Sequence, residues 1–359
     1  MRELSAARLT EGEKNYPSVS LSSTAPLTRG AAKEVIAMNA NNKVIVIAGP
    51  TASGKTRLGI ELAKALRGEI VSADSMQVYK RMDIGTAKAD ASERAAAIHH
   101  MLDVAEPWEN YSVARYVEEA SRVCDDILAR GKRPIIVGGT GLYIDSLIAG
   151  RDFADNQEDM ALRRELEEQL DSKGTEAMLR ILAEFDPERA AKLQHGDRRR
   201  IIRAIEIYKL TGITATEHDR LTRQRPPRYD AARIVLNYKD RSDLYGRIDR
   251  RVDRMDELGL FEEIEALLKE GLSPESTAMQ AIGYKEAVLA VQGKMAKKEA
   301  LALIQQNSRR YAKRQLTWFR RWEGAHWIEW DKSPDFEAAR LSSTEFLRSK
   351  GYHNVANTL

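Results

Sequence analysis

The strongest chemical signal in the sequence is the segment GPTASGKT at residues 49–56, which matches the pattern G-x-x-x-x-G-K-[ST] in full. It stands between a predicted strand and a predicted helix, so successive backbone N–H groups would form an anion-binding nest at a helix N-terminus. Lys55 adds a positive charge, and the hydroxyl of Thr56 can ligate Mg²⁺. The motif predicts a phosphate-chain site without specifying a nucleotide or a hydrolysis reaction. Its residues are Gly49, Pro50, Thr51, Ala52, Ser53, Gly54, Lys55 and Thr56.

Two further polar residues each follow a predicted strand. Asp74 ends the segment EIVSAD, and its carboxylate could coordinate Mg²⁺ through water, act as a base or cap the next helix. Residue chemistry alone leaves these three roles open. Thr140 lies in GGTGLY at a predicted helix start, where its hydroxyl could contact a ligand or serve as an ordinary N-cap.

Two segments are strongly basic. DRRRIIRAIEIY (197–208) places Arg200 and Arg203 near each other on a predicted helix, with Arg199 adjacent. SRRYAKRQLTWFRRW (308–322) carries six cations and no acid, with aromatic residues between them. Cations contact phosphates and aromatic rings can stack on bases, so we favour a nucleic-acid surface over a solvated helix face. The cations are Arg309, Arg310, Lys313, Arg314, Arg320 and Arg321, and the aromatic residues are Tyr311, Trp318, Phe319 and Trp322.

Other candidate sites are weaker. His99 and His100 could bind a metal ion together with Asp103, but adjacent residues point to different faces of a helix. The single cysteine, Cys124, excludes an internal disulfide and is typical of a reducing compartment. Its neighbours have helical apolar spacing, so we expect a buried residue and not a reactive thiol.

Strands alternate with helices through much of the chain. Short apolar strands are predicted at 43–49, 69–74, within 132–143, at 233–238 and at 326–330. This alternation indicates an α/β fold with a P-loop NTPase-like, doubly wound parallel sheet. Such sheets bind ligands at the carboxyl ends of their strands, so Gly49, Asp74 and Thr140 should face one crevice.

Residue composition and the predicted secondary structure divide the chain into segments. We expect a disordered N-terminal extension at 1–40 and a discontinuous P-loop core domain at 41–150 and 230–330. Residues 151–229, helical throughout 159–211, should form an all-helical insertion domain, and 331–359 a C-terminal tail helix. Single helices are predicted at 242–270 and at roughly 296–322.

Composition excludes several classes of protein. The 359 residues carry a formal net charge of +3, which does not by itself indicate a nucleic-acid partner. The longest apolar run, VIVIA at 44–48, is far shorter than a bilayer span. No signal-peptide apolar region is present, so we expect no membrane association and a cytoplasmic location.

The order of the motifs resembles the tRNA dimethylallyltransferase (isopentenyltransferase) family over residues 43–323. The resemblance implies a P-loop core related to nucleotide kinases and a helical insertion that contacts tRNA. It implies transfer of a dimethylallyl group from dimethylallyl diphosphate to N6 of the adenosine immediately 3′ of the anticodon, with Mg²⁺ as cofactor, the tRNA anticodon stem-loop as partner and a monomeric protein. The motifs are GPTASGKT, DSMQVYKRMDIGTAK, HHMLDV, PIIVGGTGLY, DRRRIIRAIEIY, RIDRRVDRM, QAIGYKE and YAKRQLTWFR.

The resemblance also implies roles for single residues. Asp74 matches the family's base, and Thr140 the residue that contacts the target adenine. Arg247 and Arg251, one helical turn apart, could face the diphosphate. Arg199 stands where some members carry Gln, which departs from the pattern. The residues that match tRNA-contacting positions are Asp74, Ser75, Met76, Gln77, Arg163, Arg199, Arg200, Arg203, Gln280, Gly283, Tyr284, Lys285, Arg309, Arg310, Lys313, Arg314 and Gln315.

Two rival functions remain from the residues themselves. The first is a P-loop nucleotide kinase or NTPase with RNA as a secondary partner. Against it, the strand PIIV leads into Gly-Gly-Thr at 138–140 and not into the Asp of a Walker B strand. The second is a non-catalytic RNA-binding module with an inactive P-loop, and the intact Lys55, Thr56 and Asp74 argue against it.

Overall fold

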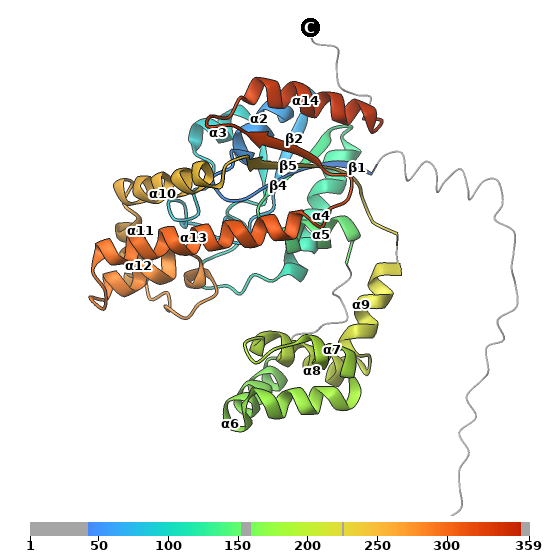
Figure 1. Ribbon diagram of the computed structural model, residues 1–359, viewed down its shortest axis with the longest axis vertical. Helices are drawn as coiled ribbons and strands as arrows, with labels where there is room; N and C mark the ends of the chain where they lie inside the picture. Colours follow the sequence, from blue (N-terminus) through green and yellow to red (C-terminus); the bar gives the residue numbers. More distant parts are fainter. Residues whose placement is uncertain (1–41, 152–158, 225, 353–359) are drawn as a thin grey trace, which may run out of the picture. The chain divides into compact units, whose positions relative to one another are not determined.

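The computed structural model describes residues 42–151, 159–224 and 226–352 (Figure 1). The extension expected at 1–40 lies outside these residues. Within them, no helix is long and apolar enough to cross a membrane.

A six-stranded sheet forms the centre of the core, in the order β3-β2-β4-β1-β5-β6. Every paired neighbour runs parallel, which confirms the predicted P-loop-like α/β fold. Because parallel strands end at the same edge, the loops after β1, β2 and β4 meet there. The strands are β1 (Lys43–Ala48), β2 (Gly68–Ser72), β3 (His99–His100), β4 (Arg133–Gly138), β5 (Asp230–Tyr238) and β6 (His326–Trp330).

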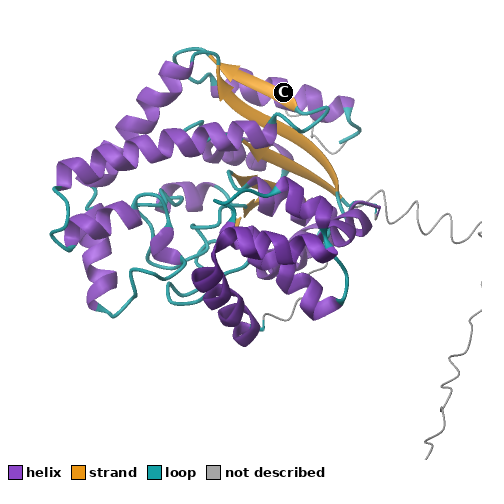
Figure 2. Ribbon diagram, turned by 60° about the horizontal axis from the view of Figure 1, so that its bottom comes forward, coloured by secondary structure: helices purple, strands orange, loops and turns teal. Residues whose placement is uncertain are grey.

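Helices cover both faces of this sheet, as Figure 2 shows with strands in orange and helices in purple. Val44 and Val46 of β1 belong to a core cluster shared with α4 (Val113–Ala129) and α5 (Gly141–Ala149). Ile45 and Ile47 belong to a second cluster shared with α2 (Lys55–Leu66) and α14 (Phe336–Ser349). Alternate residues of one strand therefore face different helix layers, as expected for a doubly wound sheet.

The remaining core helices follow β2 and β5. α3 (Ala91–Ala96) precedes β3, whereas α10 (Arg241–Glu257), α11 (Leu260–Lys269), α12 (Tyr284–Val291) and α13 (Lys297–Phe319) lie between β5 and β6. A 3₁₀ turn, η1 (Ala278–Gln280), stands before α12. The single helix expected at 242–270 is two helices, because Gly259 has a φ of 97° and starts α11 in a new direction.

The segment between α5 and β5 consists of helices joined by short turns, with no strand among its described residues. It contains α6 (Met160–Phe185), α7 (Pro187–Lys192), α8 (Arg198–Thr211) and α9 (Ala215–Gln224). These helices have their own apolar core, which includes Leu166, Leu182 and Ile205. The buried Asp186 carboxylate accepts from the backbone of Arg189 and of Thr216, which holds the turns into α7 and α9 together. The region expected to be helical throughout 159–211 therefore contains three helices, α6, α7 and α8, and α6 is kinked at Gly174.

Candidate active site

The loop between β1 and α2 has the backbone that an anion nest requires. Gly54 caps α2 with a φ of 91°, and Ala52 also has a positive φ of 64°. A Cβ atom at Gly49 would lie 2.6 Å from the carbonyl oxygen of Leu236 in β5. Both glycines are therefore needed for the conformation and the close packing of the loop.

Cationic side chains surround this loop. The Lys55 ammonium donates to the carbonyl of Pro50 at 2.7 Å, and the Arg247 guanidinium donates to the carbonyl of Ala52 at 3.2 Å. Burial, together with the nearby Arg251, lowers the pKa of Lys55 to about 7, and the Asp74 carboxylate partly opposes this shift. The site therefore disfavours the charge on Lys55 until an anion compensates for it.

Asp74 lies at the carboxyl end of β2, next to the tip of β4. One of its carboxylate oxygens accepts from the backbone N–H of Met76 at 3.0 Å. The Thr140 hydroxyl accepts from the backbone N–H of Ser75 at 3.1 Å and caps no amide of α5, so it is not an ordinary N-cap. A Cβ atom at Gly138 would meet the carbonyl oxygen of Ala73 at 2.1 Å, so the two strand tips fit closely only with glycine there.

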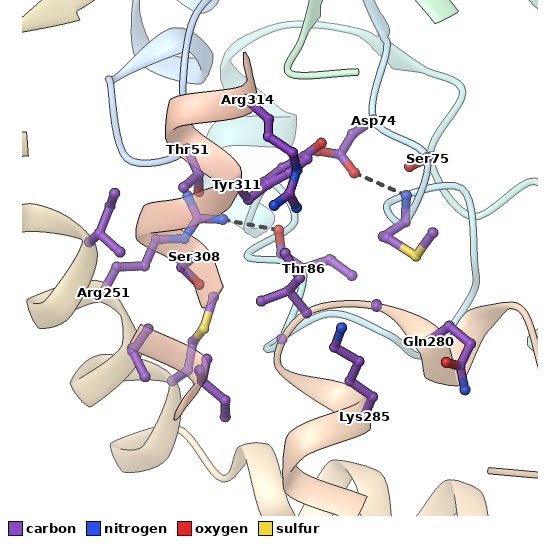
Figure 3. A pocket seen from close by; sticks show the side chains of 18 residues that line it. Thr51, Asp74, Ser75, Thr86, Arg251, Gln280, Lys285, Ser308, Tyr311 and Arg314 are labelled. Atoms are coloured by element: carbon purple, nitrogen blue, oxygen red, sulfur yellow. Dashed lines mark hydrogen bonds between the residues drawn. The ribbon is translucent and has the colours of Figure 1, made fainter. Parts of the chain in front are cut away.

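A cavity of about 320 Å³ opens in front of Asp74 (Figure 3). One end is polar, where Thr51, Asp74, Arg251 and Tyr311 converge. The rest of the lining mixes apolar side chains with polar ones, among them Lys285. The apolar lining includes Ile248, Val252, Met255 and Ile304, and the remaining polar lining includes Gln280, Ser308 and Arg314.

A second, smaller cavity of about 80 Å³ shares the polar end of the first. Thr51, Asp74, Arg251 and Tyr311 line both cavities, whereas Lys55 and Thr56 line the second and not the first. Asp74 therefore lies where the small cavity beside the P-loop meets the 320 Å³ cavity, whose lining is part polar and part apolar. The Thr56 hydroxyl and the Asp74 carboxylate offer oxygen atoms to the same small cavity, and oxygen ligands are those that Mg²⁺ prefers.

Burial changes the acid–base properties of the two groups beside Asp74. The Arg251 guanidinium donates to the carbonyl of Thr86 at 3.1 Å, and burial lowers its pKa although Asp74 opposes the shift. Burial and the nearby Asp74 carboxylate raise the pKa of Tyr311 to about 12. Tyr311 thus stays a neutral phenol next to the carboxylate.

Several residues expected to contact tRNA are buried instead. Gln315 is 5% exposed; its amide oxygen accepts from the N–H of Thr51, and its amide nitrogen donates to the carbonyl of Gly139, both at 2.9 Å. Tyr284 is fully buried and donates to Glu263 at 2.5 Å. These side chains form hydrogen bonds between the loops and helices around the site, and almost none of their surface is accessible to RNA.

Two more expected contacts serve the fold in this structure. The Gln77 amide donates to backbone carbonyls of the loop at 86–87 and accepts from Ser72. Aromatic residues at the end of α13 and just after it are also used internally, since the indoles of Trp318 and Trp322 both donate to Asp145, at 2.7 and 2.8 Å. The expectation that the aromatic residues alternate with cations to stack on bases is therefore wrong for the buried Trp322 and Phe319.

The cations expected to contact RNA fall into two groups. Arg310, Lys313 and Arg314 are exposed on α13 and make no ion pair with any residue that the structure describes. Arg309 instead pairs with Asp249. Among the expected cations of the helical segment, Arg199 is exposed without an ion pair to a described residue, whereas the other three pair with carboxylates. These pairs are Arg163–Glu167, Arg200–Asp197 and Arg203–Glu206.

One residue that organises the site carries no sequence signal. The buried Lys88 ammonium donates to the carbonyl of Tyr79 at 2.7 Å and to the carboxylates of Asp83 and Asp103. It thereby fixes the loop that follows Asp74. The Asp103 carboxylate is thus paired with Lys88, and no cluster of metal-binding side chains occurs in the described part of the chain.

Comparison with known proteins agrees with this geometry. Residues 77–322 match the family model described as IPP transferase, and 42–103 match that described as isopentenyl transferase. The tRNA dimethylallyltransferase of Carboxydothermus hydrogenoformans is 48% identical over 314 residues, which cover 88% of this chain and 99% of the relative. That of Caldanaerobacter subterraneus is 44% identical over 309 residues, with 86% and 98% covered.

Solved structures show the same likeness. The tRNA isopentenylpyrophosphate transferase from Bacillus halodurans is 40% identical with a TM-score of 0.65, covering 87% of this chain and 98% of that one. A eukaryotic dimethylallyltransferase, described as acting on tRNA, is 30% identical with a TM-score of 0.73, covering 87% and 79%. The chain therefore belongs to the IPP transferase family, which contains the tRNA dimethylallyltransferases.

Proposed function

We propose that this protein transfers the dimethylallyl group of dimethylallyl diphosphate to N6 of the adenosine immediately 3′ of the anticodon in tRNA, releasing diphosphate. The family supports a prenyl transfer to tRNA. The observation that carries the assignment of the reaction centre is the position of Asp74, where the P-loop cavity meets the 320 Å³ cavity that apolar residues help to line. The donor and the acceptor base can reach one carboxylate from the two sides.

The donor's diphosphate would lie on the P-loop. Its charge would meet the loop N–H groups, the Lys55 ammonium and the Arg251 guanidinium, and it would return to Lys55 the positive charge that burial disfavours. The Thr56 hydroxyl would hold Mg²⁺ in the small cavity that Asp74 also lines, and the metal would supply further positive charge against the departing diphosphate. Such preorganised groups lower the barrier because they act where negative charge develops.

The acceptor adenine would enter the larger cavity after leaving the stack of the anticodon loop. Flipping a loop base costs on the order of a few kcal/mol, and the apolar wall around Val252 and Met255 can receive its ring. The Asp74 carboxylate would accept a hydrogen bond from N6 and orient its lone pair towards the allylic carbon. The Thr140 hydroxyl accepts from the backbone N–H of Ser75, so it would hold in place the residue that follows Asp74.

The proposed step balances in atoms and charge. A bond forms between N6 and the first carbon of the dimethylallyl group, while that carbon's bond to oxygen breaks and its electron pair leaves with the diphosphate. The N6 proton passes to the Asp74 carboxylate as general base. The exposed cations Arg310, Lys313 and Arg314 would neutralise tRNA phosphates, so affinity should fall steeply with salt.

We also propose that the protein acts as a monomer in the cytoplasm. The resemblance of its motifs to those of the family supports the monomeric state. The single cysteine, Cys124, supports the cytoplasmic location because a chain without an internal disulfide is suited to a reducing compartment.

The test is an assay with Mg²⁺, dimethylallyl diphosphate and an unmodified tRNA that carries adenosine 3′ of the anticodon, followed by mass spectrometry of the digested nucleosides. Asp74→Asn should lower turnover by about 10²–10⁴-fold, because it removes the base yet keeps the acceptor for the Met76 N–H. Binding of tRNA should remain nearly intact. Equal losses of binding and rate would contradict the base assignment, and ATP turnover without a prenylated product would support the kinase alternative.

A further inference from the structure

The chain beyond residue 322, where the matched family model ends, returns to the P-loop. Strand β6 pairs with β5 and ends at Trp330, which is 4% exposed. Helix α14 begins six residues later, and its first residue, Phe336, lies against Trp330 with ring centroids 5.4 Å apart. The C-terminal segment therefore brings two aromatic side chains to one place beside the P-loop.

The Trp330 side chain holds the P-loop by a hydrogen bond to the backbone of the loop. The indole N–H donates to the carbonyl of Ser53 at 2.8 Å, and this hydrogen bond is buried. A nest that directs N–H groups towards an anion must direct carbonyl groups elsewhere, and each buried carbonyl needs a donor. Trp330 supplies this donor for Ser53, as Arg247 does for Ala52 and Lys55 for Pro50.

Phe336 covers the loop from outside. A Cβ atom at Gly54 would lie only 2.9 Å from the Phe336 ring, so the ring already contacts the loop backbone. The Arg57 guanidinium lies over the ring, 4.5 Å from its centroid. Phe336 also lines a third cavity of about 530 Å³, together with Lys55 and a group of arginines. These arginines are Arg57, Arg247, Arg250 and Arg251.

Helix α14 is fixed firmly enough to impose this geometry. Ala339 and Leu347 belong to the same core cluster as Leu58 and Leu62 of α2, the helix that follows the P-loop. At its far end the Tyr352 hydroxyl accepts from a backbone N–H of β5 and lies within hydrogen-bonding distance of carbonyl groups of β1 and β5. The segment expected as a tail helix is therefore part of the core.

We propose that Trp330 and Phe336 are positioning residues of the donor site: Trp330 holds the P-loop in the shape that presents its N–H groups to a diphosphate, and Phe336 shields that diphosphate from water. This inference rests on the proposed function only for the identity of the donor. It concerns affinity for diphosphate, which can be measured without prenyl transfer.

The test uses the full-length protein and inorganic diphosphate with Mg²⁺ as the probe, titrated by calorimetry. Trp330→Phe keeps an aromatic side chain, smaller than the indole and without its N–H, and Phe336→Ala removes the cover. Each should raise the Kd for diphosphate about five- to tenfold, which corresponds to the loss of one net hydrogen bond or a similar contact. Phe336→Tyr keeps the ring and should restore binding to within about twofold of the parent protein.

Trp327→Phe is the matched control. Trp327 lies in the same strand three residues earlier, and within the described residues its indole makes no hydrogen bond to the P-loop. It should change neither the Kd for diphosphate nor the KM for dimethylallyl diphosphate. In Trp330→Phe this KM should rise by the same factor as the Kd, with kcat and tRNA affinity unchanged, whereas a partly unfolded enzyme would show a lower kcat and the parent KM.

The outcomes separate this inference from the proposed function. Parent-like diphosphate affinity in both Trp330→Phe and Phe336→Ala would overturn it, whatever their stability. A parent protein that binds diphosphate but forms no prenylated tRNA, with the variants still weakened, would refute the proposed function and leave this inference standing. A parent protein that does not bind diphosphate would refute both.

Discussion

The buried amide of Gln315 joins two loops of the active site, and its removal should destabilise the fold more than it weakens RNA binding. Gln315→Leu nearly preserves the side-chain volume but leaves the Thr51 N–H and the Gly139 carbonyl without their partner at 2.9 Å. Each unsatisfied buried group costs about 1–3 kcal/mol. Gly139 is buried, whereas Thr51 lines two cavities and can reach water, so we expect a total loss of about 2–4 kcal/mol.

Urea unfolding followed by tryptophan fluorescence measures this loss, and filter binding measures tRNA affinity at several salt concentrations. Lys313→Leu is the control, because Lys313 is exposed on the same helix two residues earlier. It should leave the free energy of unfolding within about 0.5 kcal/mol of the parent value. It should also reduce by about one the slope of the logarithm of tRNA affinity against the logarithm of salt concentration. If Gln315→Leu kept the parent unfolding midpoint and behaved like Lys313→Leu towards tRNA, the amide would be an RNA contact and its role in joining the two loops would be refuted.

Three further predictions concern pH and stability. Because burial lowers the pKa of Lys55 to about 7, diphosphate binding at pH 8 should take up a proton; calorimetry in two buffers should show this uptake, and its persistence in Lys55→Arg would contradict it. Hydrogen bonds, first that from Arg130, hold the pKa of the buried Glu69 well below its usual range, so its stabilisation is present above about pH 4.5 and is lost as the pH falls further. Glu69→Gln should therefore flatten the acid side of a stability–pH curve, and an unchanged curve would refute this. Tyr352→Phe should lower the free energy of unfolding by about 1–3 kcal/mol because the buried Ala232 N–H loses its acceptor, and a change below about 0.5 kcal/mol in urea unfolding would count against that contact.

Elements with a local signature could be predicted from the sequence. The P-loop, β1 and α2 follow from one contiguous motif, and β4 and β5 from apolar runs that a parallel sheet buries on both faces. Strand β3 could not be recognised in the same way, because it has two residues and they are both histidines. Its strand conformation depends on pairing with Ile70 and Val71 of β2, which is a long-range contact that no local pattern reveals.

The roles of single residues in the site were harder to predict. Asp74 and Thr140 could be placed together because both follow parallel strands at the same edge of the sheet. Gln315 and Lys88 are polar residues in polar segments, and only the tertiary structure shows that each is buried and satisfies several groups at once. The apolar residues that line the cavity of about 320 Å³ were not predicted, because Val252 and Met255 have the ordinary spacing of an amphipathic helix.

Helix α13 explains why catalysis and RNA binding should be inseparable in this chain. Its residues at helical spacing have three different environments: Ser308 and Tyr311 line the cavity with Asp74, Ala312 and Phe319 lie in the core, and Arg310 and Lys313 face solvent. Because one rigid helix carries all three faces, the proposed RNA-binding cations stand at a fixed distance from the proposed base. A tRNA held by these cations is therefore held in one register with respect to Asp74, so the energy of phosphate contacts can also serve to place the target adenine.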